Sequence, residues 1–218
     1  MPERQKIVNP EPRWPAVIAI LAVGGLYYAL PPSLSPGPDW LVPAIVVVFS
    51  LAGLAGHRAG AHDFVRIAGY VGLAIVTGAM VVSLALLILG LIQHTESAQR
   101  LLASALSLWI SNLLIFASWY WRLDAGGPHQ RDLRGAHTDG AFLFPQMMLD
   151  AELRREMGEE EWRPGFVDYL FLAFNTSTAF SPTDVPVLSR WAKVLMMLQA
   201  SISLATIAIL AARAVNIL

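Results

Sequence analysis

Long apolar segments alternate with short polar ones along most of the chain. A helix needs about 20 apolar residues, within a range of roughly 17–25, to cross the hydrocarbon core of a bilayer. Segments close to this length predict transmembrane helices, and they lie at residues 14–30, 40–56, 67–92, 101–121 and 194–212. The third segment holds 26 uncharged residues and can span a bilayer with some tilt.

A sixth apolar segment, residues 166–180, is shorter than the others. At about 1.5 Å per residue it forms a helix of only about 22 Å, whereas the hydrocarbon core is about 30 Å thick. We therefore predict a re-entrant half-helix here. The expected fold class is an all-α integral membrane protein with five transmembrane helices, and with one re-entrant half-helix and loop before the last helix.

This pattern divides the chain into three regions: a four-helix membrane region at 1–121, a polar inter-helix loop at 122–165, and a half-helix, turn and last helix at 166–218. Within the loop, "DAELRREMGEEEW" predicts a short acidic surface helix. Before it, "WYWR" is typical of an aromatic belt at the membrane interface, from which Arg122 extends toward water. Small residues in the apolar segments predict close helix packing, and these are Gly24, Gly25, Gly53, Gly56, Gly69, Gly72 and Gly78.

Composition supports a membrane location. Hydrophobic residues make up 56% of the 218 residues and charged residues 14%, against about 25% charged residues in soluble domains. With five spans, 13 of the 15 Lys and Arg residues fall on the side of the N-terminus and the polar loop, which the positive-inside rule places in the cytoplasm. We expect a multi-pass protein of the cell membrane, embedded in the lipid bilayer, whose first apolar segment is retained. The net charge of -1 indicates no nucleic-acid partner.

Several kinds of chemistry have no support in the sequence. The absence of cysteine excludes disulfides, thiol catalysis and thiolate metal sites. The five histidines lack metal-ligand spacing, and we interpret them as surface residues. Adjacent carboxylates in "GEEEW" do not share a helix face, and no GxSxG nucleophile motif occurs. The sequence therefore predicts a protein that is not an enzyme and that uses no cofactor and no bound metal.

The stretch "NTSTAFSPTD", residues 175–184, interrupts the apolar pattern with hydroxyl side chains, a proline and an acid. Pro182 and Pro186 predict a non-helical chain from about residue 180 to 188. Irregular backbone at membrane depth is tolerated only where protein buries it or where it lines a watery cavity. The C-terminal end of a half-helix also favours a cation. The candidate ion-binding residues are Thr176, Thr178, Ser181, Thr183 and Asp184.

The order of half-helix, hydroxyl-rich turn, acid and long last helix resembles the pore module of the pore-loop cation channels over residues 166–218. "TAFSPTD" takes the place of the filter sequence and its trailing acid, and Thr176 or Thr178 matches the threonines that enter the filter. The resemblance implies a homotetramer that binds or conducts a monovalent cation, with Gln199 lining the pore. The C-terminal third also resembles an uncharacterised bacterial family of multi-span membrane proteins, which implies membrane location only.

Two features depart from potassium channels. Ser181 and Thr183 stand where those channels have filter glycines, which indicates a wider pore with hydroxyl and carboxylate ligands. The distribution of Lys and Arg residues places the entry side of the turn in the cytoplasm, whereas potassium-channel filters are entered from outside the cell. Either the loop is inverted, as in glutamate-receptor-type channels, or residues 166–180 span the membrane, or the short second segment does not.

The same residues allow a non-conducting interpretation. Thr and Ser side chains in membrane helices can bond back to a carbonyl or to a neighbouring helix, and "SPTD" can be an ordinary capped turn. The chain is then a monomeric or dimeric membrane scaffold, or a partner-binding protein that uses the loop at 122–165. For Gln199 alone, hydrogen bonding between helices is the favoured prediction over pore lining.

Overall fold

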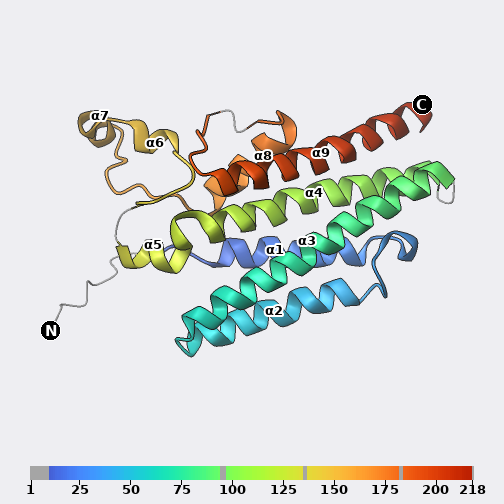
Figure 1. Cartoon of the computed structure of the whole chain (residues 1–218), viewed down its shortest axis with the longest axis horizontal. Coiled ribbons are helices and arrows are strands. Elements are labelled where there is room, and N and C mark those ends of the chain that lie inside the picture. Colours follow the sequence, from blue (N-terminus) through green and yellow to red (C-terminus); the bar gives the residue numbers. More distant parts are fainter. Residues whose placement is uncertain (1–9, 94–96, 135–136, 182–183, 218) are drawn as a thin grey trace.

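The computed structural model describes residues 10–93, 97–134, 137–181 and 184–217, and helices dominate this part of the chain (Figure 1). The long helices are α1 (Trp14–Tyr28), α2 (Leu41–Arg58), α3 (His62–Gln93), α4 (Ala98–Leu123) and α9 (Arg190–Ile217). The short helices are α5 (Pro128–Arg134), α6 (Pro145–Met148), α7 (Ala151–Glu156) and α8 (Phe166–Thr178), and there are 3-10 turns at Pro32–Leu34 and Asp124–Gly126. The expected all-helical fold class is confirmed for the described residues.

Helices α2, α3, α4 and α9 are long and apolar enough to cross a membrane. Helix α1 is apolar but has only 15 residues. It ends at Tyr28 because Pro31 and Pro32 follow closely, and the residue before a proline disfavours the helical conformation. Four of the five expected spans therefore have the required length, and the fifth stays a prediction.

Helix α4 lies at the centre of the bundle, where it packs against α1, α3, α8 and α9 (Figure 1). Helix α2 lies at one edge and contacts α1 and α3. The four helices α1, α2, α3 and α4 thus form a ring in which each helix has two neighbours. This ring brings the end of α2, the start of α3, the start of α1 and the end of α4 to the same end of the molecule.

Glycines allow the close approach of α2 to its neighbours, as the sequence predicts. A Cβ added at Gly24 would lie 3.3 Å from Val46 Cγ1, and one added at Gly72 would lie 2.9 Å from Phe49 Cγ. Gly56, near the end of α2, is packed as tightly against the start of α3. Other glycines of the predicted set have no atom within 4 Å of an added Cβ, and these are Gly25, Gly53 and Gly78.

Helix α8 enters the bundle and the chain then returns to the end from which it entered. Its first residue, Phe166, packs its ring against Trp121 near the end of α4, with 5.9 Å between ring centroids. After α8 ends at Thr178, the described chain is non-helical up to α9. The Leu188 N–H donates to the Ala141 carbonyl (2.8 Å) beside an isolated bridge between residues 142 and 187. The chain thus reverses between α8 and α9, as the half-helix pattern predicts.

The polar loop folds over this same end as α5, α6 and α7 (Figure 1). The predicted acidic surface helix is α7, and it is exposed. Asp150 caps it by accepting a hydrogen bond from the Leu153 N–H (2.8 Å), which satisfies one of the backbone donors that a helix N-terminus leaves free.

Candidate functional site

The residues of the predicted ion-binding turn are divided between the protein interior and its surface. Thr176 is buried and donates its hydroxyl to the Leu172 carbonyl at 2.8 Å, one turn back in α8. Thr178 donates in the same way to Phe174 (2.9 Å) but is exposed. Ser181 and Asp184 are exposed as well, and Thr183 lies outside the described residues. The hydroxyls of Thr176 and Thr178 therefore bond to carbonyls of their own helix, which is one of the two arrangements expected for the non-conducting interpretation.

Gln199 connects three helices in the middle of the bundle. Its side chain is fully buried, and its Nε2 donates to the Ala173 carbonyl (2.8 Å) and to Ser177 Oγ (2.9 Å) of α8. Its Oε1 accepts a hydrogen bond from the Tyr120 hydroxyl of α4. Asn112 of α4 donates to the Gln199 backbone carbonyl at 3.3 Å. The favoured prediction, bonding between helices, is confirmed, and the pore-lining role stays a prediction.

A second group of bonds occupies the last turn of α8. The Ser203 hydroxyl of α9 donates to the Ser177 carbonyl at 2.7 Å, and Trp109 Nε1 of α4 donates to Ser203 Oγ at 3.2 Å. Carbonyls at the C-terminal end of α8 therefore accept hydrogen bonds from α9 side chains. These bonds join the C-terminal end of α8 to α9, and through Ser203 to α4.

Asp168 caps the other end of α8. Its carboxylate accepts a hydrogen bond from the Gly165 N–H at 2.8 Å. Partial burial raises the pKa of the Asp168 carboxyl, although the backbone hydrogen bond from Gly165 acts in the opposite direction. Asp168 was one of the few acids near an apolar segment in the sequence, and its contact is that of a helix cap.

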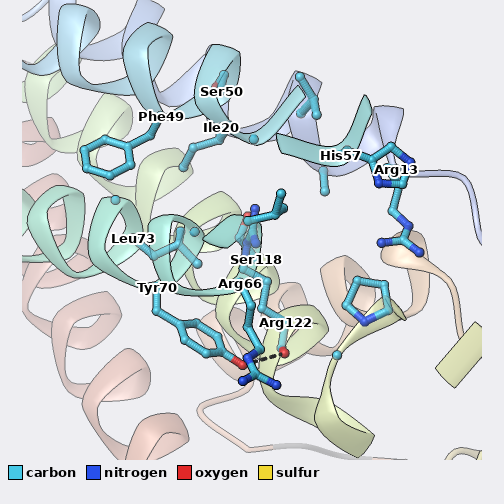
Figure 2. A pocket seen from close by; sticks show the side chains of 18 of the residues that line it. Arg13, Ile20, Phe49, Ser50, His57, Arg66, Tyr70, Leu73, Ser118 and Arg122 are labelled. Atoms are coloured by element: carbon cyan, nitrogen blue, oxygen red, sulfur yellow. Dashed lines mark hydrogen bonds between the residues drawn. The ribbon is translucent and has the colours of Figure 1, made fainter. Parts of the chain in front are cut away.

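A cavity with a volume of about 410 Å³ lies inside the ring of α1, α2, α3 and α4 (Figure 2). This volume falls within the range of about 300–1,000 Å³ that is usual for small-molecule sites. Phe49 and Leu73 contribute to an apolar wall on one side. The opposite side carries cationic and imidazole side chains, and these are Arg13, His57, His62, Arg66, Arg122 and His129.

Arg122 points into this cavity and not away from the end of its helix. Its guanidinium lies against α3, where a Cβ added at Gly69 would be 2.1 Å from Nη1. Its Cζ is 5.6 Å from the centre of the Trp121 ring, and its backbone carbonyl accepts a hydrogen bond from the Tyr70 hydroxyl (3.3 Å). The expectation that Arg122 extends toward water is wrong, because the small Gly69 leaves room for the guanidinium between α3 and α4.

The three arginines of the cavity differ in their partners. Arg13 forms an ion pair with Asp132, and Arg66 pairs with Asp63 at 3.1 Å. For the Arg122 guanidinium, the described part of the chain provides neither a carboxylate within ion-pair distance nor a hydrogen-bond acceptor. A partly buried charge is unfavourable without a partner, so Arg122 is the cation of this cavity with free capacity to bind an anion.

Three histidines from separate elements meet at the cationic side. The rings of His62 and His129 stack with 3.8 Å between centroids and an angle of 15°. The His57 ring approaches His62 edge-on at 6.1 Å. Within the described ranges, no three His, Asp or Glu side chains form a group that could hold a metal ion. The prediction of surface histidines is confirmed for His57 and His62, which are exposed. The sequence does not reveal the cluster, because the three histidines come from α2, α3 and α5.

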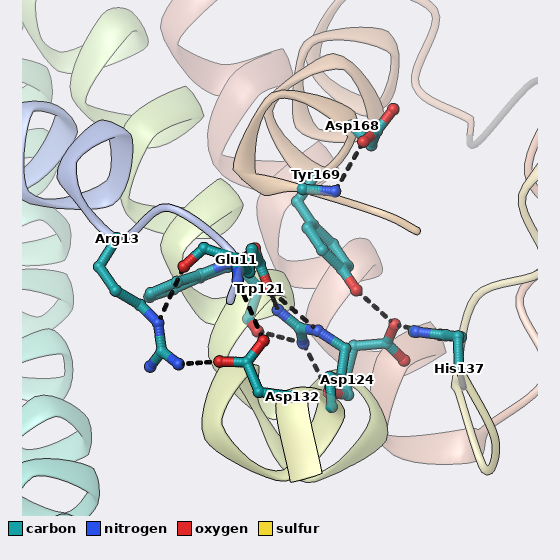
Figure 3. Close-up of polar contacts among 10 residues, drawn as sticks. Glu11, Arg13, Trp121, Asp124, Asp132, His137, Asp168 and Tyr169 are labelled. Atoms are coloured by element: carbon teal, nitrogen blue, oxygen red, sulfur yellow. Dashed lines mark hydrogen bonds and ion pairs between the residues drawn. The ribbon is translucent and has the colours of Figure 1, made fainter. Parts of the chain in front are cut away.

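Asp124 is the centre of a buried polar network where α4 ends (Figure 3). The chain turns there through Ala125, which has a left-handed φ of 49°. Asp124 Oδ1 accepts the Ala141 N–H (2.5 Å) and Oδ2 accepts the Tyr169 hydroxyl (2.7 Å). His137 Nε2 lies 3.0 Å from Oδ2. Asp124 thereby joins α4, the polar loop and α8.

A second network ties the N-terminal segment to α5. Arg131 is buried, and its Nη2 donates to Glu11 Oε2 at 2.7 Å. Its Nη1 donates to the backbone carbonyls of Trp121 and Asp124, both at 2.9 Å. The Glu11 N–H in turn donates to Asp132 Oδ1 at 3.0 Å. These paired charges hold α5 in place, and so position His129 at the cavity.

Sequence reasoning treated this part of the chain only as a polar loop. The stretch "YWRLDAGGPHQRD" contains all the charges of both networks except those of the N-terminal segment. One signal was available, namely the glycine pair that follows an acid directly after an apolar helix, which is typical of a tight turn with a buried cap. In the second network, Glu11 is 110 residues from Trp121 and 120 residues from Arg131, and the sequence alone does not pair them.

Comparison with known proteins gives no relative for this chain. No family model matches it, and neither a curated protein nor a solved structure does.

Proposed function

We propose that this chain is a multi-pass membrane protein that binds an anionic amphiphile in the cavity between α1, α2, α3 and α4. The observation that carries the proposal is the Arg122 guanidinium, which lines the cavity without a carboxylate partner in the described part of the chain. Hydrogen bonds to charged groups contribute about 1.5–3 kcal/mol, so an anion placed there gains affinity from it. The apolar wall with Phe49 and Leu73 then covers the alkyl chain of the ligand.

The placement of the bundle in a bilayer supports this function. We propose that α1, α2, α3, α4 and α9 cross the cell membrane, that α8 is re-entrant, and that the cationic side of the cavity faces the cytoplasmic headgroups. Most Lys and Arg residues lie at this end, in keeping with the positive-inside rule. An amphiphile then keeps its headgroup at the depth of the arginines and its chain at the depth of the hydrocarbon.

The size of the cavity favours a ligand with one alkyl chain. A volume of about 410 Å³ is equivalent to roughly a dozen water-sized or methylene-sized groups, at about 30 Å³ each. A phospholipid with two long chains exceeds this volume. We therefore propose a single-chain carboxylate, sulfonate or phosphate as the class of ligand, with a chain of roughly a dozen carbons inside the cavity.

The experiment compares a charged probe with a neutral one. Purified protein in phosphatidylcholine nanodiscs is titrated with pyrene-labelled dodecanesulfonate, and energy transfer from tryptophan to pyrene reports binding. The matched neutral probe is the pyrene-labelled alcohol of the same chain length. Arg122→Gln should weaken sulfonate binding roughly 10- to 100-fold, which corresponds to the loss of one charge-assisted interaction, and should leave alcohol binding unchanged.

Arg190→Gln is the matched control. Arg190 is exposed at the start of α9 and lies outside the cavity, so the same chemical change there should leave both affinities as in the wild type. Equal binding of sulfonate and alcohol by the wild-type protein would show that no anion site exists. An equal loss in the two arginine variants would assign the effect to general surface charge.

The cation function predicted from the sequence is our second candidate. It is favoured by the reversal of the chain after α8, with Phe180 in the left-handed region (φ 55°) and with Thr178, Ser181 and Asp184 exposed at the turn. In a homotetramer, four such turns could surround a monovalent cation, with Thr176, Thr183 and Gln199 completing the proposed pore. The bonded hydroxyls of α8 support instead the non-conducting class, to which amphiphile binding belongs.

Two measurements test the second candidate. Native mass measurement in detergent should give a tetramer, and liposomes that contain the protein should pass potassium or sodium ions. Asp184→Asn should change the flux, because it removes the exposed carboxylate at the turn. A monomer or dimer without cation flux would refute the cation function, and only the non-conducting class would remain.

A further inference from the structure

We propose that proton uptake by the histidine cluster, His57, His62 and His129, controls anion binding in the cavity, so that affinity for the anionic amphiphile rises as the pH falls. The inference rests on the proposed amphiphile-binding function and adds its regulation. It is carried by the position of the cluster, since all three rings line the same cavity as Arg122.

The cluster consists of imidazole side chains, which can take up protons. Imidazole is the side chain whose ordinary pKa, about 6.5, lies between pH 5 and 8. The His62 and His129 rings are stacked at 3.8 Å, a distance at which two positive charges repel each other strongly. Without an anion, the pair therefore resists taking up two protons. An anion in the cavity offsets this repulsion, so proton binding and anion binding favour each other.

Charged groups from every neighbouring element face the cluster. Burial lowers the pKa of His129, and His62 and Arg13 lower it further, whereas Asp132 raises it. His129 is therefore neutral at pH 7.5. The surrounding charged or titratable groups are Arg13 before α1, Asp63, Arg66 and Tyr70 on α3, Arg122 on α4 and Asp132 on α5.

The direction of the effect follows from this arrangement. At pH 7.5 Arg122 offers its positive charge to an anion, and proton uptake by the cluster as the pH falls adds positive charge to the lining of the same cavity. Coupling between two such binding events is typically about 5- to 150-fold. We expect the affinity for a sulfonate probe to rise roughly tenfold between pH 7.5 and 5.5. By reciprocity, bound probe should raise the apparent pKa of the cluster by about one unit.

The sulfonate probe suits this test because its charge stays constant over the pH range. Binding of pyrene-labelled dodecanesulfonate and of the matched alcohol is measured at pH 7.5, 6.5 and 5.5 in nanodiscs. The double variant His62→Gln and His129→Gln should lose the rise in sulfonate affinity between pH 7.5 and 5.5 that the wild-type protein shows. Alcohol binding should be independent of pH in both proteins.

A measurement on the wild-type protein needs no variant. The histidine ring protons are titrated by NMR with and without dodecanesulfonate, and the cluster should titrate at higher pH when the probe is bound. Sulfonate binding that is equal at pH 7.5 and 5.5, or a pH response that survives in the double variant, would overturn the regulation and leave the proposed function intact. No saturable sulfonate binding at any pH would overturn the proposed function itself.

Discussion

Replacing Gly69 by alanine should separate anion binding from the stability of the fold. The added Cβ would lie 2.1 Å from Arg122 Nη1 and 2.5 Å from Cζ. These atoms are the far end of a flexible side chain, so the guanidinium can move while the backbones of α3 and α4 keep their places. It must move by about 1.3 Å to regain an ordinary contact of 3.4 Å.

A shift of this size is enough to lose a hydrogen bond to the ligand. Bonds between charged nitrogen and oxygen atoms have lengths of about 2.7–2.9 Å, and they weaken steeply when they are stretched or misaligned. Affinity for the sulfonate probe should therefore fall roughly 10- to 100-fold, as for Arg122→Gln, since about 1.5–3 kcal/mol is lost. Stability should not fall, because alanine favours a helix over glycine by up to about 1 kcal/mol.

Gly78→Ala is the control on the same helix. An alanine Cβ there would meet no atom within 4 Å, so this variant should share any gain in helix stability and bind the probe like the wild type. Sulfonate binding is measured by energy transfer in nanodiscs, and stability by thermal unfolding of the same samples. Equal sulfonate affinity in the two glycine variants would refute the role given to Arg122. A loss of stability in Gly69→Ala alone would refute the assumption that only the side chain moves.

Three further changes test the buried polar groups. Asp124→Ala leaves the Tyr169 hydroxyl and the Ala141 N–H without an acceptor and removes the carboxylate beside His137, so the free energy of unfolding should fall by about 3–5 kcal/mol. Asp124→Asn should cost less, and equal losses in equilibrium unfolding would contradict the network. Gln199→Leu removes the side-chain hydrogen bonds between α4, α8 and α9 and should lower the free energy of unfolding by about 1–3 kcal/mol. An unchanged midpoint of equilibrium unfolding would show that these hydrogen bonds make no net contribution to stability. The raised pKa of Asp168 means that the folded protein binds the proton of this carboxyl more tightly than the unfolded chain does. The protonated carboxyl therefore contributes fully to the free energy of unfolding below the unfolded pKa of about 3.9. This contribution is lost as the pH rises through the pKa of the folded state. The stability of the wild type relative to Asp168→Asn should therefore fall over that window, and a constant difference would contradict the shift.

The helices were the part of the fold that the sequence predicts best. Expected spans at 67–92 and 101–121 correspond to α3 and α4, whose observed ends differ by at most five residues. The start of α8 at Phe166 also follows from the sequence, because Pro164 and Gly165 precede it. These features depend on the length of apolar runs and on local backbone preferences, which a single sequence contains.

The polar contacts were predicted poorly because they depend on distant partners. Gly69 was interpreted as a point of helix packing, whereas its close neighbour is the guanidinium of Arg122. The direction of Arg122 depends on the space that α3 leaves, and no local pattern around "WYWR" contains that information. Gln199 was predicted correctly as an interhelical bond, because an isolated amide in a long apolar helix has few other ways to be satisfied.

The bond between Glu11 and Arg131 has a consequence for the assembly of the chain during synthesis. The two residues are 120 positions apart, and chains grow at about 5–20 residues per second. For about 6–24 s, therefore, Glu11 has been made and its partner has not. During that time α1 is held by apolar contacts alone, and its N-terminal end closes onto the bundle only after α4 and α5 have been completed. Helix α1 is thus made before α4 and α5 but reaches its final place only after them.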